Sequence, residues 1–349
     1  MNKLTKIGVS ALCGSLASVA ANAGTMEVLG GATATWSSHE GQVTGNSLGM
    51  NSGLTFKGSG EFDNGNTMTL TLTGADQDAY SSGSIVVSTP SMGSLSLSQA
   101  TGGNGIGGYD DVMPTAWEET WGTSLGTGID LPKGVSSSTN IQYATPTILG
   151  TTLKVAYAPG NDGAANNDKS VSGGNASHKQ AGYDIVLDIK PSLGLDVLSG
   201  LNIIAGGSST EQDVEAGLSK GNTDDHQEGV GVVKFAYGPV AIGYQRSIEM
   251  TGLEAAGTTQ YYQNNAFGLS FNVNDDLTIS YGEMDSTRHV TNATGNNKRT
   301  TTVESFQASY TMGGMSLKYA NTDVDDATYA NGGSASDFEA HTLALSLAF

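Results

Sequence analysis

Apolar and polar residues alternate along much of this chain. The segment 67–73 reads TMTLTLT, 94–98 reads SLSLS and 342–349 reads TLALSLAF. Successive side chains of a β-strand point to opposite faces of the sheet, so each segment would carry apolar side chains on one face and small or hydroxyl side chains on the other. The pattern predicts an all-β protein whose two sheet faces meet different environments.

Segments of this kind recur sixteen times. We expect strands near 26–36, 48–58, 67–77, 82–88, 94–100, 139–145, 151–158, 181–190, 200–210, 229–237, 240–249, 261–272, 277–286, 301–311, 315–323 and 338–349. Seven connections are tight and rich in turn formers: 63–66, 89–93, 145–150, 191–199, 238–239, 274–276 and 312–314. We expect them to alternate strictly with longer polar connections. An even strand count with short turns on one side is typical of a transmembrane antiparallel β-barrel.

The two-residue period also assigns the faces of the expected barrel. Outward positions would be mostly aliphatic, with several tyrosines near strand ends: Val233, Phe235, Tyr237, Val240, Ile242, Tyr244, Leu277, Ile279, Tyr281, Met315, Leu317 and Tyr319. Inward positions would be small or polar and suit a water-filled lumen rather than a packed core: Thr55, Ala156, Ala236, Gln245, Thr278, Ser280, Gln307 and Ser316. Closure would pair every backbone N–H and C=O group, as hydrocarbon requires.

The N-terminus predicts export. Lys3 and Lys6 precede an apolar run at 7–20 and a small-residue cleavage site at 21–23, so residues 1–23 read as a secretory signal peptide that contains the single cysteine. The mature part would span 24–349 as one barrel domain, and removing two lysines from a formal charge of −19 leaves about −21. This acidity disfavours a nucleic-acid partner. No run of 18 apolar residues follows residue 23.

The interval 102–138 is far longer than any other. It contains two tryptophans, four clustered acids and Gly103, Gly105 and Gly108. A loop of this length in a compact protein is usually functional or disordered, and we expect this one to fold into the barrel. The glycine spacing formally matches a dinucleotide-binding fingerprint, but that motif needs a βαβ unit, and this sequence predicts none.

Several stretches resemble the general porins of Gram-negative outer membranes: 53–76, 141–160, 273–283 and 343–349, where Phe349 looks like their C-terminal assembly signal. The resemblance implies a sixteen-stranded outer-membrane barrel, usually a homotrimer, inserted by the barrel assembly machinery beside lipid and lipopolysaccharide. It also implies passive diffusion of small hydrophilic solutes and ions, without enzymatic activity. Residues 108–114 fall where the family's third external loop turns inward. This chain departs from the family in two ways: Thr115 replaces an acid after Pro114, and its arginines are only Arg246, Arg288 and Arg299.

These observations define a candidate pore site. We expect Asp110, Asp111, Glu118 and Glu119 to form an acidic constriction, and Lys57, Lys154, Lys234 and Lys318 to lie on the inner wall by strand parity. Charged rings select counter-ions, so the prediction is a preference for cations or neutral solutes. The simpler alternative is that the acids solvate a loop at the mouth and that the lysines are isolated wall residues. Trp117 and Trp121 would pack the loop against the wall or stack on a sugar-like solute.

Other functions remain as alternatives. No resident cofactor is expected, although Asp323, Asp325 and Asp326, or Asp224, Asp225 and His226, offer hard oxygen ligands for Ca²⁺ in external loops. The five histidines (His39, His178, His226, His289 and His341) show no triad spacing, which disfavours a hydrolase. A barrel with a plugged lumen that serves as a surface or adhesive protein, or a solute-specific barrel, has the same strand pattern.

Overall fold

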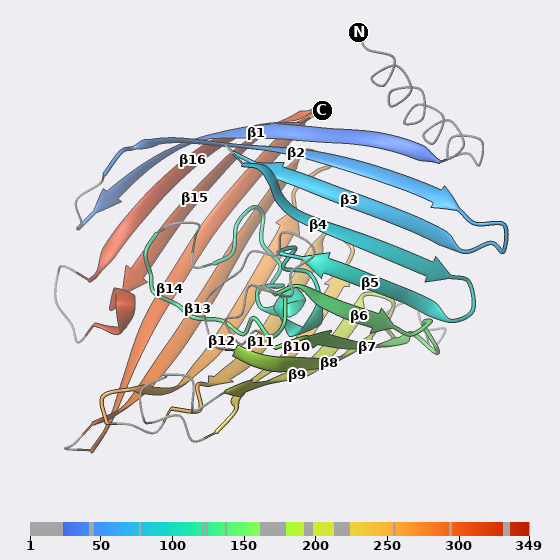
Figure 1. Ribbon diagram of the computed structural model, residues 1–349. Coiled ribbons are helices and arrows are strands. Elements are labelled where there is room, and N and C mark those ends of the chain that lie inside the picture. The colour runs from blue at the N-terminus through green and yellow to red at the C-terminus, as the bar shows by residue number, and fades with distance from the viewer. Residues whose placement is uncertain are drawn as a thin grey trace, which may run out of the picture.

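The computed structural model describes residues 24–41, 45–76, 78–120, 122, 125–136, 138–160, 179–191, 198–212, 224–253, 256–292, 295–330 and 336–348. Sixteen antiparallel strands in these ranges form a closed barrel, in which each strand pairs with the next and β1 pairs with β16 (Figure 1). Pairs such as Trp36 with Leu343 close the ring. The predicted fold class and all sixteen strands are confirmed. The signal peptide and Phe349 lie outside the described residues.

The strands have the following bounds: β1 Thr25–Glu40, β2 Leu48–Glu61, β3 Thr67–Ala75, β4 Asp78–Thr89, β5 Gly93–Gln99, β6 Asn140–Ala144, β7 Thr151–Ala158, β8 Lys179–Ile189, β9 Leu201–Gln212, β10 His226–Tyr237, β11 Val240–Met250, β12 Thr259–Asn272, β13 Leu277–Asn292, β14 Gly295–Met312, β15 Met315–Asp325 and β16 Phe338–Ala348. Two short 3-10 helices are described, η1 at Gly105–Tyr109 and η4 at Ala327–Tyr329. In the described part of the chain, no helix has the length and apolarity needed to cross a membrane.

The expected strict alternation of short and long connections is wrong. Two connections expected to be longer, β3 to β4 and β13 to β14, each leave only two residues between strands. Residues 287–300 pair across the second hairpin from Thr287 with Thr300 to Asn292 with Gly295. We expected a loop there because the segment is polar, but ladder hydrogen bonds come from the backbone. Conversely, the turn between β8 and β9 is longer than several loops.

The predicted faces of the barrel are confirmed. In β11, Ile242 and Tyr244 are exposed on the outer face, whereas Gln245 is 1% exposed on the inner face. The same alternation continues through β15, where Leu317 is exposed and Ala320 is buried. Arg246 has the outward parity of Tyr244 and is exposed, so it does not line the pore. Outward apolar side chains are therefore exposed over much of the barrel surface, as hydrocarbon contact requires.

The stretch 100–139 between β5 and β6 is called the inner segment here, and its described residues, 100–120, 122, 125–136 and 138–139, lie inside the barrel (Figure 1). Ile106 and Tyr109 of the segment pack in one cluster with inward side chains of β8, β9 and β10, including Val186 and Val232. Leu125 and Leu131 pack in a second cluster with inward side chains of β12 to β16, such as Met284. The expectation of an unpacked, purely small and polar interior is therefore wrong wherever the inner segment covers the wall.

Candidate pore constriction

Glycines on the inner wall make room for the inner segment. Gly243, Gly268 and Gly282 are consecutive partners across β11, β12 and β13. A Cβ atom added to Gly268 would lie 2.8 Å from the carbonyl oxygen of Pro114 and 3.0 Å from the Cβ of Met113. Such distances are shorter than van der Waals contact, so the wall admits the segment here only because these positions lack side chains.

Side chains from the wall hold the middle of the segment. Ser280 Oγ accepts a hydrogen bond from the backbone N–H of Ala116 at 2.8 Å. Gln307 accepts from the N–H groups of Trp117 and Glu118 at 3.1 and 3.0 Å, and its Nε2 donates to the Glu118 carbonyl oxygen at 2.9 Å. Gln307 is 1% exposed, so its polar atoms are satisfied by the segment rather than by water.

Asp184 ties the start of the inner segment to its end. Its carboxylate accepts from the N–H of Ile106 at 2.9 Å and from the N–H of Val135 at 3.2 Å, and the residue is 2% exposed. Glu228 on β10 accepts from the N–H groups of Lys133 and Gly134 at 3.0 and 2.6 Å. Sequence analysis missed both acids. The signal that could have identified them is a negative charge at an inward strand position, where small or neutral polar residues were expected.

Three of the four predicted acids come together in the inner segment. Asp111 shares side-chain hydrogen bonds with Asp110 and Glu119. Loss of hydration is the largest cause that raises the pKa of Asp111 to about 7, and repulsion from Asp110 and Glu119 adds to it, although the residue is still exposed. Burial and the Glu119 charge also raise the pKa of Asp110, against the opposing charge of Lys133. Glu118 instead is held through its backbone by Gln307.

The four predicted lysines all have inward parity, but they play different structural roles. The Lys154 ammonium donates to the Tyr109 hydroxyl at 2.5 Å, and Lys318 lies 5.8 Å from the Trp117 ring centroid, so these two contact the inner segment. Lys57 lies opposite Glu27 on β1. Lys234 is the cross-strand partner of Gly243, the wall glycine against which Pro114 packs. Beside the acids the neighbouring cation is Lys133, and a lysine counterpart below them stays a prediction.

The remaining predicted residues are partly described. Trp117 packs under Lys318, consistent with packing against the wall, whereas Trp121 lies outside the described residues. Arg288 on β13 holds its guanidinium carbon 4.8 Å from the centroid of the Tyr329 ring in η4. Asp224 and Asp225 are exposed, and His226 turns toward Glu228 and Glu249 instead of toward them. A loop Ca²⁺ site stays a prediction.

A closed sixteen-stranded barrel with an apolar outer face and an inward-folded segment defines the class of outer-membrane channels. Comparisons with known proteins agree with this class. A family model described as Gram-negative porin matches residues 8–346, so the chain belongs to the Gram-negative porin family. It is a porin of the bacterial outer membrane. No curated protein sequence matches the chain.

Solved structures with similar folds include several porins. Salmonella typhi OmpF in complex with daunomycin is 13% identical with a TM-score of 0.66, covering 94% of this chain and 99% of that one. An anion-selective porin from Comamonas acidovorans is 12% identical with a TM-score of 0.63, covering 93% and 100%. The trimer form of OmpT, an outer-membrane protein of Vibrio cholerae, is 13% identical with a TM-score of 0.64, covering 94% and 100%. At these identities the likeness shows the fold alone.

Proposed function

We propose that this porin passes small hydrophilic solutes and ions by passive diffusion and prefers cations. The observation that carries the proposal is the acidic cluster of Asp110, Asp111 and Glu119 on a segment held inside the barrel. Carboxylates held together at a narrow part of a pore attract cations and repel anions. Lys133 offsets only part of this charge, because it also forms an ion pair with Asp130 at 3.0 Å.

The inner wall that the segment leaves uncovered supports an open channel over a plugged barrel. Inward Lys57 on β2 is exposed, and inward Thr55 and Thr73 are only partly buried while their hydroxyls lie 3.4 Å apart. Water-accessible polar side chains on the wall are what a diffusion path requires. The Comamonas protein is described as anion-selective, so this fold does not by itself impose cation selectivity and the charged residues must decide the sign.

The assembly state and mode of insertion form part of the same proposal. A similar structure exists as a trimer, and we propose a homotrimer for this chain. Phe349 would serve as the C-terminal signal for the barrel assembly machinery, with lipopolysaccharide around the external rim. The family and fold are typical of channels without enzymatic activity.

Planar-bilayer recording of the purified protein tests the channel and its selectivity separately. We expect open steps of nanosiemens order and a reversal potential of the cation-selective sign across a KCl gradient. Well-folded protein that gives no steps would instead support the plugged surface-protein alternative. Open steps with an anion-selective reversal potential would keep the channel and refute the role of Asp110, Asp111 and Glu119.

A further inference from the structure

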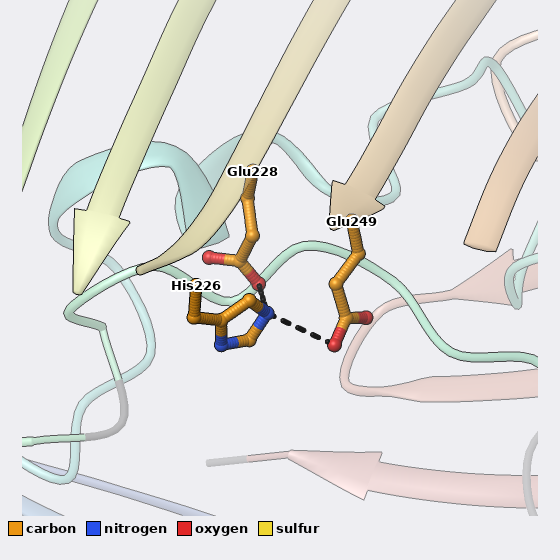
Figure 2. A group of neighbouring side chains, drawn as sticks. All are labelled: His226, Glu228 and Glu249. Carbon is orange, nitrogen blue, oxygen red and sulfur yellow. Dashed lines mark ion pairs between the residues drawn. The ribbon is translucent and has the colours of Figure 1, made fainter. Parts of the chain in front are cut away.

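Three potential metal ligands meet on the inner wall between β10 and β11, apart from the acidic cluster. Glu228 and Glu249 are direct cross-strand partners, and His226 lies two residues before Glu228 on the same face of β10. Figure 2 shows the His226 ring turned toward both carboxylates. Neighbouring strands therefore fix all three side chains, which is a more rigid arrangement than loop residues would give.

The distances fit one small metal ion. His226 Nε2 lies 3.1 Å from Glu249 Oε1 and 3.9 Å from Glu228 Oε1, and one ligand atom from each residue lies within 4.8 Å of the others (Figure 2). A tetrahedral Zn²⁺ ion with ligand bonds of about 2.0–2.2 Å places its ligand atoms roughly 3.2–3.6 Å apart. Among the residues that the structure describes, no other group of three His, Cys, Asp or Glu side chains meets this distance criterion.

Burial and charge favour a cation in this group. Glu249 is 8% exposed, and its Oε2 atom is buried without a hydrogen-bond partner. A buried carboxylate oxygen without a partner is costly. Even a protonated His226 would balance only one of the two carboxylates, and the nearby Lys133 ammonium pairs with Asp130. A divalent cation would neutralise the pair of carboxylates.

We propose that His226, Glu228 and Glu249 bind a divalent transition-metal ion, with Zn²⁺ as the representative. An imidazole with two carboxylates is a donor set that suits Zn²⁺, whereas Ca²⁺ prefers six to eight oxygen ligands. Three protein ligands leave the fourth position to water. Glu228 would also keep its hydrogen bonds from Lys133 and Gly134, so the ion would lie against the end of the inner segment.

Zinc titration of the purified, detergent-solubilised protein tests this site. We expect one Zn²⁺ per chain by isothermal titration calorimetry at pH 7.5, and no competition from millimolar Ca²⁺. His226→Ala and Glu249→Gln should each weaken binding by about tenfold or more, since even the loss of an outer partner of a metal ligand costs 10- to 100-fold. Neither substitution removes Glu228, so the inner segment keeps its contacts.

His341→Ala is the matched control. His341 faces Glu339 at 3.8 Å but belongs to no three-ligand group in the described chain, so its removal should leave zinc binding unchanged. Heat-modifiable gel migration would verify that each variant forms the barrel. Absence of stoichiometric zinc binding to the wild type would overturn the proposal, as would wild-type affinity in folded Glu249→Gln and His226→Ala.

Discussion

The two halves of the inner wall differ in what covers them. Along β8 to β14 many inward side chains are buried beneath the inner segment, with Val186 and Val303 at 0% exposure and Met284 at 1%. Along β1 to β3 the inward side chains have no such cover, and Lys57 is exposed. The same two-residue alternation builds both halves, so alternation alone does not decide which half is packed.

The uncovered half is lined by hydroxyl groups that pair across strands. Thr33 and Ser346 lie 2.9 Å apart across the β1–β16 junction, and the Thr25 and Ser59 hydroxyls lie 2.6 Å apart. The covered half instead carries amides and carboxylates that accept hydrogen bonds from backbone N–H groups of the inner segment, and glycines against which the segment packs closely. In the proposed channel, solutes would pass between this hydroxyl-lined wall and the acidic cluster of the segment.

Neutralising the acidic cluster should give the largest effect. In the triple variant Asp110→Asn, Asp111→Asn, Glu119→Gln, we expect the cation-to-anion permeability ratio to fall by about fivefold or more. Two unit charges 4 Å apart interact with about 1 kcal/mol even in bulk water. Reversal potentials across a KCl gradient at low ionic strength, where screening is weak, provide the measurement.

The control for this variant removes the same number of acids from exposed turns. Asp63→Asn, Asp275→Asn, Asp276→Asn changes three acids that lie in turns between strands rather than on the inner segment. It should leave the permeability ratio close to the wild-type value. Equal losses of selectivity in both triple variants would show that net charge, and not the cluster, sets ion preference.

A methyl group placed under the inner segment should have a smaller effect. In Gly268→Ala the added Cβ would meet the Pro114 carbonyl oxygen at 2.8 Å. We expect overpacking to destabilise the barrel by roughly 1–3 kcal/mol and to lower single-channel conductance as the segment moves toward the lumen. Urea unfolding in detergent and bilayer recording measure the two effects.

Gly53→Ala provides the matched change on the uncovered wall. Gly53 also faces inward, but the nearest atom to its added Cβ is the Gly74 carbonyl oxygen at 4.0 Å. Replacing glycine with alanine within a strand should then stabilise slightly, by up to about 1 kcal/mol. Destabilisation of similar size in both variants would argue that the segment does not need the wall glycines.

The barrel was predictable from sequence because a period of two recurs along the whole chain. The inner contacts were not, because they join residues far apart: Asp184 accepts from Ile106, 78 positions away, and Glu228 accepts from Gly134, 94 positions away. A charged residue at an inward strand position was the available signal for both acids, but parity does not state what covers a wall position. The extension of β13 and β14 through 287–300 was missed for the opposite reason, since a polar composition suggested a loop.

Position in the sequence predicted the grouping of three acids in the candidate site. Asp110, Asp111 and Glu119 were identified by their position within one long loop, and they do come together. Glu118 was grouped with them by adjacency in sequence, and its backbone N–H and carbonyl groups bond to the Gln307 side chain.

The smallest effect we predict is a dependence of selectivity on pH near neutrality. The pKa of Asp111 is raised to about 7, so this carboxyl holds its proton below pH 7 and becomes ionised above it. Raising the pH from 5.5 to 8.5 should therefore make the cluster more negative by about one charge and increase cation preference, though by less than the triple variant lowers it. Reversal potentials of wild type and Asp111→Asn across this range measure the change. The single variant should lose the inflection near pH 7, and an inflection that persists in it would assign the titration to another group.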